Sequence, residues 1–392
     1  MIDRTEQEVL SVYQKVNPST YLIEKDEDEY NLRKNFIENL FLYRLNFPPK
    51  MFENATLLEF GTGTGEHSLF YLKWGASCTF VEMNKLACQR ADKLFQFFDI
   101  ESTKYQIQNK SLFDFRSTKK FDIVISLGVI HHTENKERAF DIKAQYLKSG
   151  GFLVLGIGNS AGIFQRNLQR AILYHLANSE EQIVSFADEL FSEHLDRAEK
   201  FGRRSRKSII YDSYVNPKID TLSISEVLSL FSKNNLKLYS SWPPIIPAIL
   251  GDPADRKPLL YEKLHNTLSI PEIVYLTHTT EDVNQLRKFE KEAVAVMTPF
   301  KELVNLLNDV KPDTPLDLVK RKIDTLEAAE LKLNPYISYI SMLETLLKET
   351  RCIIESLQKN CIDDLKKNIE NTQVLFRGTC GLGMSWYIGF KT

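Results

Sequence analysis

The residues of this chain whose types and spacing could do chemistry include three glycines that stand between two glutamates. In order, they are Glu59, Gly61, Gly63, Gly65 and Glu82. The first glutamate lies in a short apolar run, residues 55–60, and the second follows another, residues 78–81, with a helix-compatible segment between the runs. Strand, glycine turn, helix, strand and acid is the layout of a nucleotide-binding βαβ unit. Glycines let a ligand approach bare backbone, and the acid can accept hydrogen bonds from two ribose hydroxyls.

The spacing of the glycines bears on which nucleotide could bind. A dinucleotide fingerprint has the form G-x-G-x-x-G, but here Gly65 comes one residue early and Glu66 takes the expected place. A negative side chain at a helix N-terminus repels a pyrophosphate. This weakens the interpretation of the chain as a nicotinamide oxidoreductase. A phosphate-binding P-loop needs Gly-Lys-Ser/Thr, whereas Gly65 is followed by Glu66 and His67. Neither phosphate-binding pattern fits the turn.

The pattern Glu59-x-Gly61-x-Gly63-x-Gly65 resembles motif I of the class I S-adenosylmethionine-dependent methyltransferases. Their cofactor carries adenosine and an amino acid but no phosphate, so an acidic loop is tolerable. Residues 121–133, FDIVISLGVIHHT, resemble motif IV of the same family, and residues 147–151, LKSGG, resemble its turn before the fifth strand. With these motifs in the family's order, residues 52–159 are identified as a methyltransferase core.

The resemblance implies a role for each cofactor-binding residue. The glycine loop would contact the methionine portion and the ribose, Glu59 would serve the methionine ammonium, and Glu82 would take the ribose hydroxyls. An acid usually stands where Ser111 aligns, so Ser111 would be a weaker partner for the adenine amino group. The predicted cofactor-binding residues are Glu59, Gly61, Thr62, Gly63, Gly65, Glu82, Met83, Ser111, Leu112 and Leu127.

Methyl transfer is an in-line displacement that needs the nucleophile to be aligned and water to be excluded. An oxygen or nitrogen nucleophile must also lose a proton, for which a histidine suits neutral pH. His131 and His132 end the predicted fourth strand, where ligands gather in an open α/β sheet, and either could be a general base or orient the substrate. The alternative is that they only bond to backbone. The predicted substrate-binding lid residues are Tyr211, Tyr214 and Asn216, with Asp212 among them.

The chain around these motifs predicts an α/β fold of Rossmann-like type. We expect a seven-stranded, mostly parallel sheet with an antiparallel last strand, an N-terminal helical cap and a large helical insertion between the last two strands, residues 236–242 and 385–391. The cap helix would bury Leu32, Phe36, Leu40 and Tyr43, either over the cofactor or against the sheet. The predicted units are 1–50 (cap), 51–160 (cofactor-binding core), 161–242 (lid helices and sixth strand), 243–376 (insertion) and 377–392 (closing strand).

Two further patterns leave alternatives open. Apolar residues recur at helical spacing in the insertion. They could form an interface between two copies of the chain, and hence a homodimer, or they could form an intramolecular core. They are Val283, Leu286, Phe289, Val296, Phe300, Leu303, Leu307, Ile340, Leu343, Leu347, Ile354 and Leu357. A basic cluster within residues 197–207 is either a solvated face or a contact for an anionic substrate or partner.

Composition narrows the class of protein. The 392 residues carry a formal net charge of −2, so no basic field indicates nucleic acid. The charged start of the chain predicts no signal peptide, and no apolar run approaches the ~18 residues of a membrane span. Five scattered cysteines without CxxC pairs favour a reducing cytoplasm and predict neither disulfides nor a metal site.

Taken together, the sequence predicts an enzyme that transfers a methyl group from S-adenosylmethionine to an oxygen or nitrogen nucleophile. The acceptor could be a small molecule, such as a sugar or natural product, or a protein side chain. The alternative is a cofactor-binding scaffold or regulatory protein whose helical insertion binds a partner protein.

Overall fold

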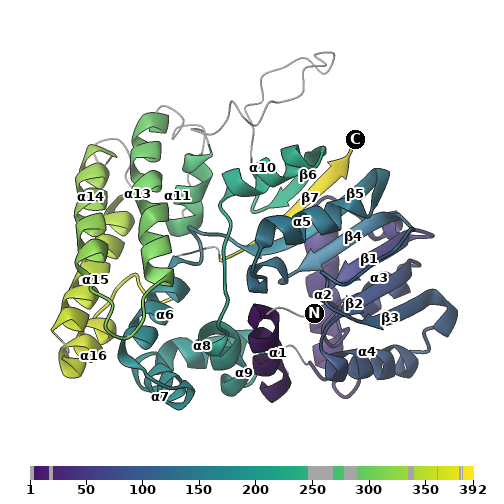
Figure 1. Cartoon of the computed structure of the whole chain (residues 1–392), viewed down its shortest axis with the longest axis horizontal. Coiled ribbons are helices and arrows are strands. Elements are labelled where there is room, and N and C mark those ends of the chain that lie inside the picture. Colours follow the sequence, from purple (N-terminus) through teal and green to yellow (C-terminus); the bar gives the residue numbers. More distant parts are fainter. Residues whose placement is uncertain are drawn as a thin grey trace.

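The computed structural model describes residues 4–16, 21–245, 268–277, 289–333, 340–359, 361–378, 381 and 383–392. Figure 1 shows a twisted sheet with helices on both faces and, at one side, a separate layer of long helices formed late in the chain. The N-terminal helix lies between the sheet and the helices that follow its fifth strand.

The sheet has seven strands in the order β3-β2-β1-β4-β5-β7-β6. Their bounds are β1 Thr56–Phe60, β2 Ser77–Glu82, β3 Tyr105–Asn109, β4 Phe121–Leu127, β5 Leu147–Gly158, β6 Leu236–Trp242 and β7 Met384–Lys391. Only β7 runs antiparallel to its neighbours, and it is separated from β6 in the chain by the whole insertion. The predicted fold, including the closing hairpin, is confirmed. Strand order reverses between β1 and β4, the switch point at which open α/β sheets bind ligands.

The central strands are apolar because both faces of the sheet are covered. Leu57 of β1 packs on one side with α3 (Ser68–Lys73) and α4 (Lys85–Phe97). Leu58, the next residue, packs on the other side with α5 (Lys136–Gln145) and α10 (Ile224–Lys233). The alternation fixes the register of β1, and therefore the place where the glycine turn leaves the sheet.

The N-terminal region forms α1 (Arg4–Val16), α2 (Glu27–Glu38) and a π-helical turn, η1 (Asn39–Arg44). Asp26 caps α2 by accepting hydrogen bonds from two backbone amides in the first turn. The π-helical turn is wider than an α-helical one, so it changes which side chains face the sheet beyond Glu38.

The predicted apolar face of this helix is wrong at three of its four positions. Leu32, Phe36 and Tyr43 are 36%, 40% and 70% exposed. The helix buries Ile37 and Phe41 instead, which are also four residues apart. Phe41 packs edge to face against three other aromatic rings, and this cluster, which is assembled from distant segments, decides which face is buried.

A layer of helices follows β5 and ends in a second π-helical turn. It consists of α6 (Phe164–Leu176), α7 (Glu180–Leu190), α8 (Ser192–Gly202), α9 (Arg206–Ile210) and η5 (Tyr211–Val215). The chain then runs back toward the end of β5, where Ser160 and Thr221 bond through their hydroxyls at 2.9 Å. The predicted capping box at Ser223 and Glu226 begins α10.

The described helices of the insertion pack on one another, and they contact α6 and α7. They are α11 (Ser269–Thr277), α13 (Glu290–Asn308), α14 (Asp317–Leu333), α15 (Ile340–Gln358) and α16 (Ile362–Glu370). The seam residues Val296, Phe300, Leu303, Leu307, Leu343, Leu347, Ile354 and Leu357 are all buried in one core with the lid helices. These side chains form intramolecular core rather than an exposed seam, Phe289 packs against it, and Val283, Leu286 and the side chain of Ile340 lie outside the described residues.

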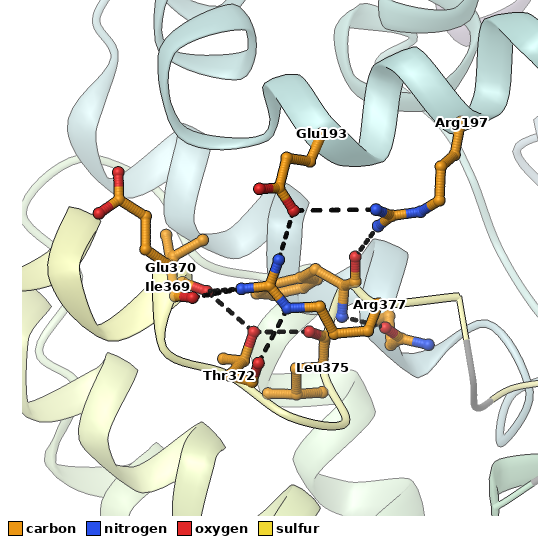
Figure 2. A network of polar contacts seen from close by, with 9 residues as sticks. Glu193, Arg197, Ile369, Glu370, Thr372, Leu375 and Arg377 are labelled. Atoms are coloured by element: carbon orange, nitrogen blue, oxygen red, sulfur yellow. Dashed lines mark hydrogen bonds and ion pairs between the residues drawn. The ribbon is translucent and has the colours of Figure 1, made fainter.

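An arginine fastens the end of the insertion to the lid, as Figure 2 shows. The Arg377 guanidinium donates to the carbonyl of Thr372 at 2.8 Å and to that of Ile369 at 3.1 Å. It also pairs with Glu193 of α8 at 2.5 Å, while Arg197 of the same helix donates to the carbonyl of Phe376. These bonds hold the last turn of the insertion before the chain enters β7.

The basic cluster is largely occupied by partners within the chain. Besides Arg197, the cluster arginines that form ion pairs are Arg203 with Glu29, Arg204 with Asp212, and Arg206 with Asp188, Asp196 and Glu199. The arginines therefore hold the lid together, and this use does not support a contact with an external anion.

Candidate active site

The glycine turn after β1 is built from three residues with positive φ, at +77° for Gly61, +58° for Gly63 and +89° for Gly65. A Cβ on Gly61 would lie 2.2 Å from Val129 Cγ2, and one on Gly65 would lie 2.9 Å from Ala91 Cβ. At Gly63 a Cβ would meet no atom within 4 Å. Two of the glycines are therefore required by close packing, whereas the middle one faces open space.

Glu82, at the end of β2, braces this turn. Its Oε2 accepts a hydrogen bond from the Gly63 amide at 2.9 Å, and its Oε1 accepts one from the Asn84 amide at 2.8 Å. Burial raises the pKa of the carboxyl, and the two amides work against that rise. A carboxylate oxygen has two acceptor sites, so one remains on each oxygen of Glu82. Two remaining sites side by side suit a vicinal diol.

Glu59 lies behind the turn rather than in the cavity in front of it. The side chain is 4% exposed and accepts a hydrogen bond from the Ser68 hydroxyl of α3. Burial raises the pKa of Glu59 to about 7, although the Ser68 bond opposes the rise. The acid thus ties the end of β1 to the helix that follows the turn.

A cavity opens at the switch point between the glycine turn, the end of β4 and α1, with about 930 Å³ of empty space including the part open to solvent. The predicted site residues that line it are Gly61, Gly63, Glu82, Met83, Leu112, Leu127 and His132. Residues that the sequence did not single out also line it, above all Glu6, Val9, Leu10 and Tyr13 of α1. The N-terminal helix therefore closes the cavity, while α2 packs on the sheet.

Ser111 and Thr62 are predicted site residues that lie beside the cavity rather than in its wall. The Ser111 hydroxyl donates to the carboxylate of Glu6 at 2.5 Å and accepts from the Phe113 amide. Thr62 is buried within the turn, and its hydroxyl has no hydrogen-bond partner. An acid thus reaches the position beside Ser111 after all, but α1 supplies it.

His132 belongs to a hydrogen-bonded series of side chains that begins on α1. The series consists of Tyr13, His132, Asp212 and Arg204, and we call it the relay. Its Nδ1 lies 2.7 Å from the carbonyl of Lys218, which can only accept, so Nδ1 carries a proton. Its Nε2 lies 2.9 Å from the hydroxyl of Tyr13, and that hydroxyl is also 3.2 Å from Asp212 Oδ1. Arg204 donates twice to Asp212 Oδ2, at 3.1 Å each.

The charges along the relay follow from burial and proximity. Burial lowers the pKa of His132, partly opposed by Asp212, so the imidazole is neutral at neutral pH and Nε2 accepts the Tyr13 proton. Burial and Asp212 hold the pKa of Tyr13 well above its usual range. Burial raises the pKa of Asp212, but Arg204 and His132 more than offset it and leave the carboxylate charged. The site therefore holds a neutral phenol between a proton acceptor and an anion.

The other predicted chemical residues lie in different surroundings. The rings of His131 and His132 lie 3.9 Å apart between centroids at a tilt of 53°, and the buried Nδ1 of His131 has no hydrogen-bond partner. The Tyr211 hydroxyl donates to Glu180 and the Tyr214 hydroxyl to Gln169, so both are engaged within the helical layer. Asn216 is fully buried, and its amide nitrogen has no partner.

Sequence reasoning missed two residues that the cavity and the relay use, Glu6 and Tyr13. It named Asp212 as a lid candidate but not its ion pair with Arg204. The heptad-like spacing of Glu6, Val9 and Tyr13 on α1 was a signal that one face of that helix is covered. Among the described residues, no group of three or more His, Cys, Asp or Glu side chains is arranged to hold a metal ion. None of the described helices has the length and apolar character needed to cross a membrane.

A family model described as a methyltransferase domain matches residues 32–239, more than half of the chain. The chain belongs to this family. The match confirms the resemblance drawn from the sequence motifs and, with it, S-adenosylmethionine as the cofactor. The turn also fits such a cofactor, because Gly63 faces open space and Glu82 keeps two acceptor sites.

Solved structures share the fold at low identity. The YcgJ protein from Bacillus subtilis is 19% identical, with a TM-score of 0.31, over 48% of this chain and 65% of its own. The N-methyltransferase NodS from Bradyrhizobium japonicum, solved with S-adenosyl-L-homocysteine, is 19% identical over 41% of this chain and 76% of its own, with a TM-score of 0.31. PKMT2 from Rickettsia typhi is 16% identical over 56% of this chain and 46% of its own, with a TM-score of 0.41.

The chain thus spans just under two thirds of YcgJ and under half of PKMT2. No curated protein sequence matches it significantly. The acceptor therefore has to be argued from the residues of this chain.

Proposed function

We propose that this protein transfers a methyl group from S-adenosylmethionine to an oxygen or nitrogen nucleophile of an acceptor. The observation that carries the proposal is that one cavity joins the Gly63–Glu82 turn to Tyr13 and His132. The bound cofactor supplies an electrophilic methyl group on a sulfonium centre. When the methyl group is transferred, the rest of the cofactor is the leaving group and becomes a neutral thioether. The chain then has to hold the cofactor, exclude water and accept a proton.

The holding groups are those of the turn and of α1. Glu82 offers its two remaining acceptor sites to the ribose hydroxyls, and Gly61 and Gly63 let the cofactor touch the backbone. Glu6 supplies, from α1, the acid that the family's usual position lacks at Ser111. Because Glu6 and Tyr13 both lie on α1, that helix must be seated for the site to be complete, and its seating also excludes water.

Tyr13, His132 and Asp212 provide the route for the acceptor's proton. The single Tyr13 hydroxyl proton can be donated to His132 Nε2 or to Asp212, but not to both. When the acceptor gives up its proton through the Tyr13 oxygen, the proton ends on His132 Nε2, and the Tyr13 hydroxyl turns to Asp212. The carboxylate of Asp212 then stabilises the imidazolium, and this attraction offsets part of the cost of placing a positive charge on a buried histidine.

An acceptor that reaches Tyr13 is a small molecule, such as a sugar or natural product, or a protein side chain that extends into the cavity. The alternative of a scaffold whose insertion binds a partner finds no support in the described seam, because its side chains are buried in the chain's own core. The free cysteines of the described residues favour a reducing cytoplasm as the place of action.

Transfer of a labelled methyl group tests the proposal. The protein and methyl-labelled S-adenosylmethionine are added to a desalted lysate and to its small-molecule fraction. Mass spectrometry then follows product as a gain equal to the mass of the labelled methyl group less the hydrogen that it replaces. We expect product with the wild type and a loss of about 10²-fold or more in His132→Gln, with S-adenosylhomocysteine binding retained. Binding of S-adenosylhomocysteine without transfer to any component would refute the enzyme and favour the scaffold.

A further inference from the structure

Arg166, in the first turn of α6, is a partly buried arginine without an ion-pair partner. Within the described parts of the chain, no carboxylate lies within 4.0 Å of its guanidinium, although most lid arginines are paired. Arg170, one helical turn later on the same face, is satisfied by the carbonyls of Tyr214 at 2.9 Å and Ser213 at 3.3 Å. Arg166 is therefore a cation that remains available to an anion outside the chain.

Two amides near Arg166 are also unsatisfied. Asn167 is fully buried, and neither its amide nitrogen nor its oxygen has a hydrogen-bond partner. Asn216 is fully buried, and its oxygen accepts from the Lys218 amide while its nitrogen has no partner. Each such group costs about 1–3 kcal/mol if nothing bonds to it, so both amides need a polar partner, which a water or a ligand can supply.

The path of the chain brings these residues together. The segment 213–222 runs along α6, because Ser213 and Tyr214 meet Arg170 at one end and Leu222 accepts the Ser160 amide at the other. Arg166 lies one helical turn before Arg170, and its charge acts on His131, so the guanidinium of Arg166 lies near the histidine pair.

The histidine pair closes the same space from the opposite side. The carbonyl of Lys218, within that stretch, bonds to His132 Nδ1 at 2.7 Å, and the Asp220 amide donates to the carbonyl of His131 at 2.8 Å. Both bonds fix the histidines beside the stretch that faces α6. His131, whose Nδ1 has no partner, completes what we call the α6 polar cluster, consisting of Arg166, Asn167, Asn216 and His131.

The sign of the charge in the α6 polar cluster is positive. Burial is the largest cause that lowers the pKa of His131, and the charges of His132 and Arg166 lower it further, so the histidine is neutral. The nearest acid of the relay, Asp212, is already held by two bonds from Arg204. Arg166 and Arg170 are thus two cations beside the proton relay that no carboxylate of the described residues pairs with, although Arg166 helps to lower the pKa of Asp212.

We propose that the acceptor carries an anionic oxyacid group, a carboxylate or a phosphate, and that Arg166 and Asn167 bind it beside His131. The proposal rests on the proposed function, since it names the acceptor class of that site. Arg166 matches the planar fork of an oxyacid, and the Asn167 amide nitrogen donates to a remaining oxygen. The nucleophile of the acceptor is then presented on the His132 side, toward Tyr13 and the cofactor cavity.

The test uses the full-length protein saturated with S-adenosylhomocysteine and two probes, inorganic phosphate and acetate, at ionic strength held constant with sodium chloride. Thermal unfolding is recorded against the concentration of each probe. We expect a saturable rise in Tm with at least one probe, and the probe that binds more tightly identifies the oxyacid. In Arg166→Gln the apparent affinity should fall about tenfold or more.

Arg203→Gln is the matched control, because Arg203 lies in the same helical layer but already pairs with Glu29 at 2.9 Å. It should behave like the wild type. S-adenosylhomocysteine should bind Arg166→Gln as it binds the wild type. This retained binding would show that the variant is folded, so that a loss of probe binding can be assigned to the anion site. If S-adenosylhomocysteine binds but neither probe does, or if Arg166→Gln responds like the wild type, the anion proposal is wrong. If S-adenosylhomocysteine does not bind the wild type, the proposed function falls first.

Discussion

Replacement of Glu82 by Gln gives the sharpest test of how the glycine turn works. Glu82 accepts hydrogen bonds from two backbone amides, of Gly63 and of Asn84, and keeps one acceptor site on each oxygen for a ligand. Glutamine retains one oxygen and presents an NH₂ group in place of the other. One backbone amide then faces a donor, and one ligand hydroxyl loses its acceptor.

The size of the effect can be worked out from these bonds. A hydrogen bond to a charged group contributes about 1.5–3 kcal/mol, and Glu82→Gln removes one such bond to the ligand and neutralises the other. Since about 1.4 kcal/mol is a factor of ten, the affinity for S-adenosylhomocysteine should fall roughly 10- to 100-fold. The turn itself should survive, because Gly61 and Gly65 remain packed.

Isothermal titration with S-adenosylhomocysteine at neutral pH measures the loss of affinity. Glu137→Gln serves as the control, because the exposed carboxylate of Glu137 pairs with Lys233, and Lys233 keeps Asp141 as a partner after the substitution. Burial raises the pKa of Glu82. As the pH is lowered, the affinity of the wild type should therefore begin to fall at a pH above the ordinary pKa of a glutamate. Glu59 titrates in both proteins, so the difference between their pH profiles isolates Glu82. A Kd for Glu82→Gln within twofold of wild type would refute the reasoning.

Three further predictions follow from the same geometry. Gly63→Asn, a residue that tolerates positive φ, should fold with a Tm close to wild type but lose S-adenosylhomocysteine binding in titration, whereas Gly61→Ala should lower the free energy of unfolding by about 2 kcal/mol or more because its Cβ has no room. Burial lowers the pKa of Lys143 to about 7, so the unfolded chain binds more protons between pH 7 and 10.5 and stability rises with pH across that window. Lys143→Met should therefore stabilise the protein in denaturant unfolding, by about 4 kcal/mol more at pH 7 than at pH 10.5, and a pH-independent difference would contradict this. Tyr13→Phe should speed hydrogen exchange in α1, since the hydrogen bond that ties Tyr13 to His132 or Asp212 is lost, while Tyr43→Phe at an exposed position should not.

The parts of the fold that could be predicted are those fixed by local patterns. β1 and its turn follow from an apolar run and from the regular spacing of three glycines after it. The closing strands β6 and β7 were recognisable because each alternates over its own few residues, even though the whole insertion separates them. The choice between the two faces of α2 was not predictable, because an aromatic cluster built from distant segments makes it.

The site divides in the same way. Glu82 follows a strand and could be found by its position, but its bond to Gly63 is visible only in three dimensions. Tyr13 meets His132 across 119 residues and Asp212 across 199, so no spacing rule connects them. Asp212 was itself a predicted lid residue, yet its place in the site depends on Tyr13 of α1.

The central claim is that the cavity between the glycine turn and α1 holds the cofactor with its reactive end near Tyr13 and His132. A crystal structure of the protein with saturating S-adenosylhomocysteine tests this most directly. We expect density for the whole nucleoside in that cavity, with its ribose hydroxyls on the carboxylate of Glu82 and its sulfur facing the Tyr13 side. Density at another place, or a turn that stays empty while the ligand is shown to bind in solution, would contradict it.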